Sequence, residues 1–291
     1  MCGRLPQKGD ADSGAFLIKI KDFYQERVLT EGMIGRKGKK QTPEGGKEHG
    51  MEKQRLDRIL ASTGKWSRRE AKLLVKQGRV LIDGSPAASA EEKWDPASAV
   101  ITVDGEDIGY RQFTWLMMYK PGGVLSATED GKGRTVIDLL PPELRRLGLF
   151  PVGRLDKDTE GLLLLTDDGK TAHDLLSPRH HVDKVYYART AGCLTEDDRA
   201  AFRAGMTLRD GLRCLPAELE ILSAGETSEA LVTLREGKFH QVKRMLSARG
   251  KPVTYLRRVR MGNLPLDPEL MPGEYRFLTT EEREILGAER D

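Results

Sequence analysis

The spacing of apolar residues between positions 55 and 79 predicts two short helices. Leu56, Ile59 and Leu60 recur at helical intervals until Gly64 interrupts the pattern. Ser67 can cap a second helix, whose apolar stripe consists of Ala71, Leu74 and Val75. Basic residues recur every four positions on another face of this helix, so one side is expected to pack and the other to be exposed.

Two strands with tight turns are predicted next. Residues 79–82 and 100–103 have strand-like composition, and they are followed by Asp83-Gly84 and Asp104-Gly105. Asp-Gly is one of the dipeptides most typical of a two-residue hairpin turn. Residues 53–112 are therefore predicted to form a small helix-helix-hairpin domain with basic helices.

Beyond residue 112, short β-rich runs alternate with turns and a few helices. The sequence predicts strands at residues 115–119, 161–166, 184–190, 219–222 and 230–235, and a helix at residues 241–249. This order predicts an α+β domain over residues 113–291, built on a mixed or largely antiparallel sheet.

Residues 1–52 lack sustained periodicity and mix Gly, Lys, Gln and Glu, so we expect a mostly disordered leader. Met51 stands directly before the first well-patterned segment. One hypothesis is that translation begins at Met51 and that the leader is a start-site artefact. Detection of peptides from upstream of Met51 by mass spectrometry of the native protein would refute it.

Composition favours a cytoplasmic protein without a membrane partner, and we expect a monomer. The apolar runs are only a few residues long, far below the roughly 20 needed to span a bilayer. The N-terminus has no pattern of a secretory signal. Neither metal-ligand spacing nor a disulfide framework is apparent among the three cysteines, Cys2, Cys193 and Cys214.

The charges are segregated along the chain although the net charge is only +3. Residues 55–79 hold eight basic and two acidic residues, and residues 238–262 hold eight basic residues and no acidic one. Two basic patches on an otherwise acidic chain favour a polyanionic partner, since clustered cations release counterions on contact with phosphate. Two solvated faces are the alternative. In the first patch, the residues expected to bind RNA are Arg58, Lys65, Arg68, Arg69, Lys72, Lys76 and Arg79.

The densest polar cluster is the run GRLDKDTEG at residues 153–161, directly before an apolar strand. Arg154 and Lys157 flank Asp156, and nearby cations favour an ionised carboxylate that can act as a nucleophile or base. An acidic turn whose side chains cap backbone amides explains the local pattern equally well.

Two sets of motifs resemble known families. Residues 54–100, with LDRIL at 56–60, SRREA at 67–71 and DG at 83–84, resemble the alpha-L (S4-like) RNA-binding domain of a ribosomal protein and several RNA-modifying enzymes. GRLD at 153–156, followed by TEGL and TDDG, resembles the catalytic motif of the pseudouridine synthase superfamily, in its ribosomal RNA branch. YKPGG at 119–123, KVY at 184–186 and EGKFHQVKRM at 236–245 resemble its other motifs in the same order. HQVKRM and PGEYR at 272–276 are most similar to the small-subunit group.

This resemblance implies isomerisation of a uridine to pseudouridine without a cofactor or a metal. Asp156 would be the nucleophile that helps to break the bond between uracil and ribose. Tyr186 would stack on the flipped uracil, Lys243 would pair with Asp156, and Arg154 would steady the flipped nucleotide or its phosphate. His240 remains open to a role as general acid, or to contact with RNA or backbone. The implied substrate is small-subunit (16S) ribosomal RNA, free or in an assembling subunit.

Other functions stay open from the sequence. The same reaction on large-subunit (23S) RNA is one, because relatives with that substrate often carry Arg at the position of His240 or Lys243. A non-catalytic ribosome-binding factor is a second, because the basic patches alone would serve it. DKDT at 156–159 also matches the aspartyl-phosphate motif of haloacid-dehalogenase-like phosphatases, but that fold needs a buried strand before the first Asp, and here the apolar strand follows.

Overall fold

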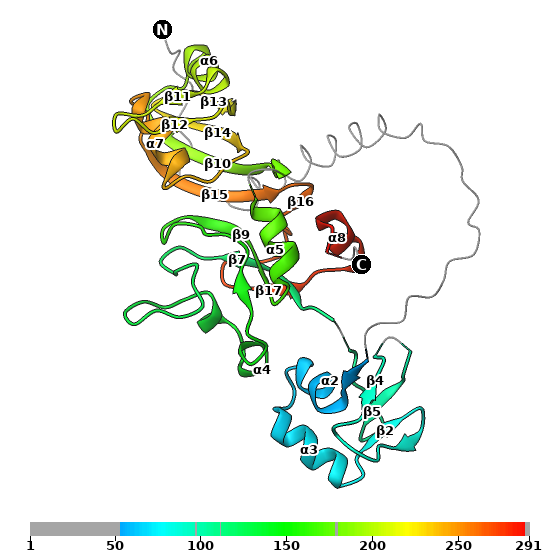
Figure 1. The fold of residues 1–291 in the computed structure, drawn as a ribbon. Helices are drawn as coiled ribbons and strands as arrows, with labels where there is room; N and C mark the ends of the chain where they lie inside the picture. Colours follow the sequence, from blue (N-terminus) through cyan, green and yellow to red (C-terminus); the bar gives the residue numbers. More distant parts are fainter. Residues whose placement is uncertain (1–52, 97, 111, 178–179, 289–291) are drawn as a thin grey trace, which may run out of the picture. The chain divides into compact units, whose positions relative to one another are not determined.

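The computed structural model describes residues 53–288, apart from 97, 111, 178 and 179 (Figure 1). The leader predicted for residues 1–52, including Met51, lies outside the described residues. Within the described part of the chain, no helix is long and apolar enough to cross a membrane.

The N-terminal part contains the two predicted helices and a four-stranded sheet. The helices are α2 (Leu56–Ser62) and α3 (Arg68–Lys76). Ser67 caps α3, because its hydroxyl accepts a hydrogen bond from the Glu70 backbone N–H at 3.2 Å while the Glu70 carboxylate accepts one from the Ser67 N–H at 2.6 Å. The sheet order is β3 (Ser85–Pro86), β2 (Val80–Ile82), β5 (Ile101–Val103), β6 (Glu106–Asp107), and β1 (Gln54–Arg55) pairs separately with β4 (Lys93–Trp94).

Both predicted hairpin turns are present in this part. Asp83 and Gly84 join β2 to β3 with φ values of 49° and 80°, and Asp104 and Gly105 join β5 to β6 with φ values of 53° and 84°. Two consecutive positive φ angles are characteristic of the type I′ turn, which Asp-Gly favours. The dipeptides therefore fix the register of both hairpins.

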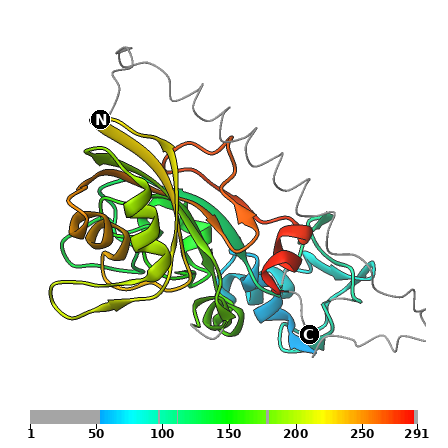
Figure 2. The same ribbon diagram turned by 90° about the horizontal axis from the view of Figure 1, so that it is seen from above.

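Residues from Trp115 onward build a nine-stranded mixed sheet. The main path is β13 (Glu218–Ser223), β14 (Thr227–Leu234), β10 (Lys184–Ala191), β15 (Val253–Met261), β9 (Glu160–Thr166), β7 (Trp115–Lys120), β17 (Tyr275–Phe277), with β16 (Leu264–Pro265) on β15 and β8 (Phe150–Pro151) on β9. β15 and β9 run parallel, whereas the other pairs within the sheet are antiparallel. The predicted α+β class with a mixed, largely antiparallel sheet is confirmed. The sheet twists along its length, as strand sterics require (Figure 2).

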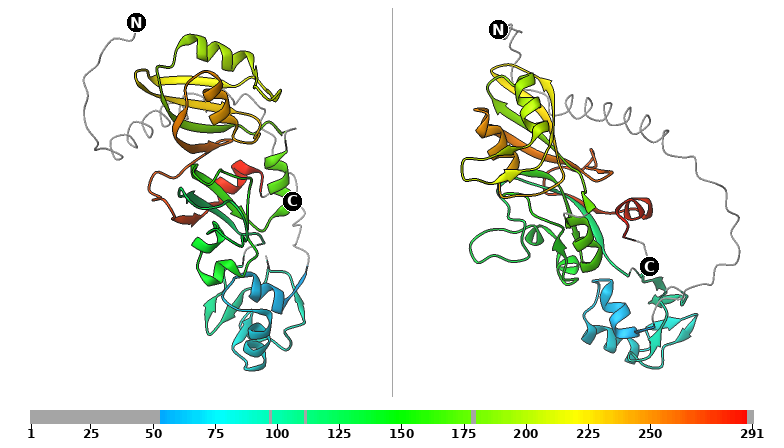
Figure 3. Two further views of the ribbon diagram at one scale, coloured as in Figure 1. Left: turned by 90° about the vertical axis from the view of Figure 1, so that its left-hand side faces the viewer. Right: turned by 45° about the horizontal axis from the view of Figure 1, so that its top comes forward.

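Helices cover the two faces of this sheet in different places. α6 (Glu196–Ala204) and α7 (Gln241–Ala248) pack on the face formed by Ala188, Val232 and Leu256. η1 (Ile137–Leu139) and α4 (Pro142–Arg145) cover the same face over β7 and β9. The two regions share this face because Tyr186 packs against the apolar core under α6 and α7 and also against the core under η1 and α4. α5 (Gly169–Leu176) and α8 (Thr280–Leu286) cover the opposite face of this half (Figures 1 and 3). A small ribbon of β11 (Met206–Thr207) and β12 (Arg213–Cys214) completes the domain.

The central strand β15 corrects one prediction from the charge pattern. The charge pattern along the chain places Arg257 and Arg258 in a basic patch, but their relative exposures are 7% and 2%. Arg258 Nε donates a hydrogen bond to the Leu162 carbonyl at 2.8 Å, and Arg257 lies over the Tyr187 ring at 5.7 Å. Because β15 lies between β10 and β9, these two arginines support the sheet and are not available to RNA.

Candidate active site

Asp156 lies in the loop between β8 and β9. The preceding residue, Leu155, is buried among the apolar side chains of the sheet, whereas the Asp156 side chain keeps 26% of its exposure. The apolar strand β9 follows the loop, as the sequence predicts. A rigid strand after a polar loop places the carboxylate at the N-terminal end of β9, where it can reach a ligand.

Buried side chains of the segment from β7 onward hold this loop. Lys120 is fully buried and its Nζ donates hydrogen bonds to the carbonyls of Pro121, Lys157 and Thr159 at 3.0, 3.2 and 2.8 Å. Ser126 exchanges two hydrogen bonds with the Leu155 backbone, at 3.0 and 3.1 Å. The loop backbone is thus fixed on both sides of Asp156.

Burial lowers the pKa of Lys120 from its ordinary value of 10.5 to about 8. The unfolded chain then binds more protons than the folded protein between about pH 8 and pH 10.5. The free energy of unfolding therefore rises with pH in that window as far as this group is concerned. A difference of roughly 2.5 between the two pKa values corresponds to about 3 kcal/mol when complete.

The Lys243 ammonium of α7 reaches the loop and contacts two carboxylates. Its Nζ lies 3.0 Å from Asp156 Oδ2 and 2.5 Å from Asp158 Oδ1. Burial acts to lower the pKa of Lys243, but hydrogen bonds to Asp158 and Asp156 outweigh it, so the pKa is raised. The hydrogen bond from Lys243 in turn lowers the pKa of the Asp158 carboxyl. The other side of α7 buries Val242, Met245 and Leu246 in the core, which fixes the helix.

His240 is the N-cap residue of α7, directly before the first residue of the predicted helix, Gln241. Its Nε2 lies 3.5 Å from Asp156 Oδ1. Asp156 therefore meets two nitrogen groups, both supplied by one turn of chain at the start of α7.

The four predicted site residues converge on one pocket. Arg154, Asp156 and Tyr186 line it, and Lys243 contacts Asp156 from α7. Tyr186 comes from β10 and is partly buried, whereas Arg154 is exposed. Apolar walls come from Leu234, Val242 and Leu256. The arrangement offers a flat aromatic ring, a carboxylate and a guanidinium around a small apolar-walled recess.

Thr159 is a pocket residue that the sequence analysis did not single out. It is 2% exposed and lines the pocket. Its buried Oγ1 has no hydrogen-bond partner among the described residues. An unsatisfied buried hydroxyl is unfavourable, so this position carries a cost to stability. The sequence feature that could have pointed to Thr159 is its position inside the motif at residues 153–161.

The basic residues of the N-terminal domain differ in their surroundings. All seven that the sequence assigns to RNA binding are exposed. Arg68, Lys72 and Arg79 form ion pairs with acidic residues of the same domain. Within the described part of the chain, no ion pair is found for the other four, namely Arg58, Lys65, Arg69 and Lys76. These four are the better candidates for phosphate contacts, because no ion pair has to be broken first.

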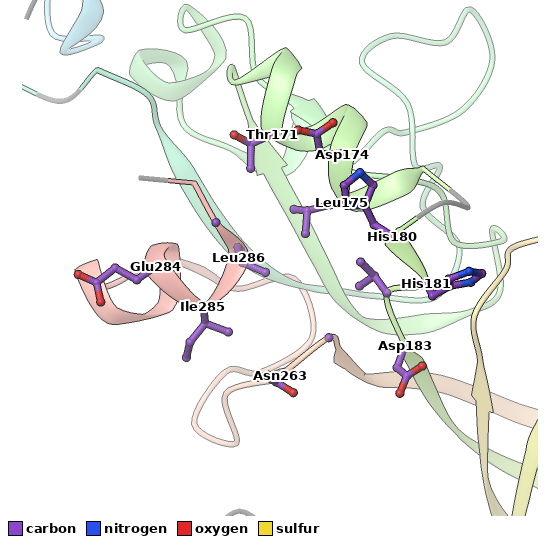
Figure 4. Close-up of a pocket in the computed structure, with 13 residues that line it drawn as sticks. Thr171, Asp174, Leu175, His180, His181, Asp183, Asn263, Glu284, Ile285 and Leu286 are labelled. Atoms are coloured by element: carbon purple, nitrogen blue, oxygen red, sulfur yellow. The ribbon is translucent and has the colours of Figure 1, made fainter. Parts of the chain in front are cut away.

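A second and larger cavity, of about 460 Å³, lies between α5, the segment before β10, the β15–β16 turn and α8 (Figure 4). His180, His181 and Asp183 stand on one side and Ile285 on the other. The residues described in the structure contain no group of three or more His, Cys, Asp or Glu side chains placed to hold a metal. This cavity is larger than the pocket beside Asp156, but the predicted site residues line the smaller one.

Known proteins with related sequences share this organisation. The family model for RNA pseudouridylate synthase matches residues 114–248, and the S4 domain model matches residues 54–96. An uncharacterized RNA pseudouridine synthase of Bacillus subtilis is 49% identical over 233 residues, covering 80% of this chain and 98% of the relative. Ribosomal small subunit pseudouridine synthase A of Vibrio cholerae is 42% identical over 229 residues, covering 78% and 97%. A pseudouridylate synthase crystal structure is 35% identical with a TM-score of 0.57, covering 80% of this chain and 99% of that one.

Proposed function

Because the chain belongs to the RNA pseudouridylate synthase family, we propose that it isomerises one uridine of small-subunit (16S) ribosomal RNA with Asp156 as the nucleophile. The reaction itself, conversion of uridine to pseudouridine in RNA, follows from the family. The substrate RNA and the residue roles are the proposal. The observation that carries it is the contact of 3.0 Å between Lys243 Nζ and Asp156 Oδ2 beside the pocket of Tyr186 and Arg154.

Conversion of uridine to pseudouridine by a nucleophile requires an ionised carboxylate and a site that holds the detached uracil. The bond between C1′ of ribose and N1 of uracil breaks, the base turns, and C5 of uracil bonds to C1′. The C5 hydrogen leaves as a proton and N1 takes up a proton, so the product is an isomer of the substrate. One carbon–nitrogen bond is exchanged for a carbon–carbon bond within the same nucleotide, so no co-reactant is needed. The Lys243 ammonium lies 3.0 Å from Asp156 Oδ2 and can orient the carboxylate for nucleophilic attack.

The pocket walls suit a pyrimidine ring. Tyr186 offers a ring face for stacking, and Leu234, Val242 and Leu256 exclude water from the other sides. A uridine in structured RNA must leave its stack to enter, and the exposed Arg154 guanidinium can brace the extruded nucleotide or its phosphate.

Small-subunit RNA is proposed from three features. The relative in Vibrio cholerae carries that substrate in its name. The HQVKRM and PGEYR motifs resemble the small-subunit group. The exposed cations of the S4 domain supply a surface for phosphates. Large-subunit RNA is the alternative outcome of the test.

The test is carbodiimide mapping of pseudouridines in ribosomal RNA from cells with and without the gene, complemented with wild type or Asp156→Asn. We expect one small-subunit position to lose pseudouridine, to regain it with wild type, and to stay unmodified with Asp156→Asn. The variant should bind the same RNA with an affinity similar to wild type. A missing large-subunit site would correct the substrate, and full modification by Asp156→Asn would refute the nucleophile.

A further inference from the structure

Phe239 and His240 form an exposed aromatic pair at the edge of the candidate active site. Phe239 is 75% exposed, more than any other large hydrophobic residue of the described chain. Its ring stacks on the His240 ring with centroids 3.8 Å apart and planes 18° apart. One face of Phe239 is therefore covered by His240, and the opposite face is open to solvent.

The pair is held in place by a hydrogen-bonded turn, which keeps His240 in a strained backbone conformation. His240 has a φ of 50°, in the left-handed region that residues other than Gly seldom adopt. The turn before it is braced by Gln241, which is 3% exposed. The Gln241 Oε1 accepts from the Lys238 N–H at 3.0 Å, and its Nε2 donates to Glu236 Oε1 at 2.6 Å. A strained residue kept by a braced turn indicates that the placement of these rings serves a purpose.

The location of the pair points to nucleic acid. His240 Nε2 lies 3.5 Å from Asp156 Oδ1, so Phe239 is one ring removed from the proposed nucleophile. The exposed guanidinium of Arg154 lines the same pocket. An exposed aromatic ring near such a cation combines a stacking surface for a base with a contact for its phosphate.

We propose that Phe239 stacks on the nucleobase next to the target uridine in the RNA chain. This rests on the proposed function, because it assigns the neighbour of the nucleotide that enters the pocket. When the uridine leaves its stack, the adjacent base loses a stacking partner. The open face of Phe239 replaces that partner and offsets part of the free energy of extrusion. His240 forms the second layer beneath Phe239.

The experiment uses the full chain and a small-subunit RNA fragment that carries the mapped site, with tritium at C5 of the target uridine. Release of tritium reports formation of the carbon–carbon bond. The variants are Phe239→Ala, Phe239→Leu and Phe239→Trp. Phe277→Ala is the matched control, because Phe277 is 40% exposed on β17, at the other end of the sheet. The Phe239 ring is mostly in solvent, so its replacement should not unfold the protein.

We expect Phe239→Ala to lower kcat/KM about 5- to 150-fold, the range for loss of one base–aromatic stack. Phe239→Leu should be nearly as impaired, Phe239→Trp should retain activity, and Phe277→Ala should match wild type. RNA with an abasic residue on the 5′ or the 3′ side of the target separates stacking from other effects. At one of these positions the abasic RNA should slow wild type but add nothing to Phe239→Ala.

Two results would overturn the inference. One is a Phe239→Ala variant as active as wild type. The other is a loss that stays the same size on both abasic RNAs, since that would mean that Phe239 acts only by orienting His240. Failure of the proposed function looks different, because wild type itself would then release no tritium from any small-subunit fragment.

Discussion

Replacement of Lys243 by Met removes the ammonium group beside Asp156 while keeping a side chain of similar length. The two charged atoms are 3.0 Å apart, and their side chains are 22% and 26% exposed. At this distance Coulomb's law gives about 1.4 kcal/mol in water and about 5.5 kcal/mol at an effective dielectric constant of 20. The partial exposure places the pair between these limits. We therefore expect kcat to fall at least about tenfold.

The assay is single-turnover release of tritium from RNA labelled at C5 of the target uridine, with RNA binding measured in parallel. Lys243→Arg keeps the charge and should restore part of the activity. Asp158→Asn should change the rate little, because Asp158 is 77% exposed and exposed ion pairs contribute about 1 kcal/mol at most. Arg244→Met is the matched control, since Arg244 is the next residue of α7 and pairs with Asp210.

A role for Lys243 as a phosphate contact predicts a different pattern. Loss of one phosphate contact weakens RNA binding and lowers the slope of log affinity against log salt by about one, with kcat unchanged. That pattern in Lys243→Met, with kcat equal to that of Arg244→Met, would refute the assignment of Lys243 to Asp156.

Three further outcomes follow from the structure. The free energy of unfolding, measured in urea at pH 7, 8 and 9, should rise with pH in wild type, because the pKa of Lys120 falls to about 8 on folding. The Lys120→Met variant should lose this rise. Equal pH dependence in both proteins would contradict the assignment to Lys120. Gly161→Ala should destabilise the fold by about 3 kcal/mol or more, since a Cβ at this position would lie 2.2 Å from the Arg258 carbonyl oxygen and the Gly161 φ is +100°. Thermal melts measure this, and a melting temperature equal to that of wild type would contradict it. Three exposed cations, Lys65, Arg69 and Lys76, can be replaced together by Ala. The slope of log RNA affinity against log salt should then fall by about three, with kcat unchanged. An unaltered slope would exclude these residues as phosphate contacts.

The sequence by itself determined the elements whose causes are local. The capping box at Ser67 and Glu70 and the two Asp-Gly turns depend on neighbouring residues only, so their positions could be assigned before the fold was known. The alternation of strands and turns gave the α+β class. The motif around Asp156 gave the family, because several motifs in a fixed order are specific even when each one is short.

Tertiary structure decided everything that depends on residues far apart in the chain. Three arginines in β15 look like an RNA-binding patch along the sequence, yet pairing of β15 between β10 and β9 buries two of them. Lys120 resembles one more surface cation until the fold places its ammonium under three carbonyls of the Asp156 loop region. The contact of Lys243 with Asp156 joins residues 87 positions apart, and only the packing of α7 on the sheet brings them within 3.0 Å. Charge and spacing along a chain carry no information on burial, and burial decides whether a cation meets RNA or holds the protein together.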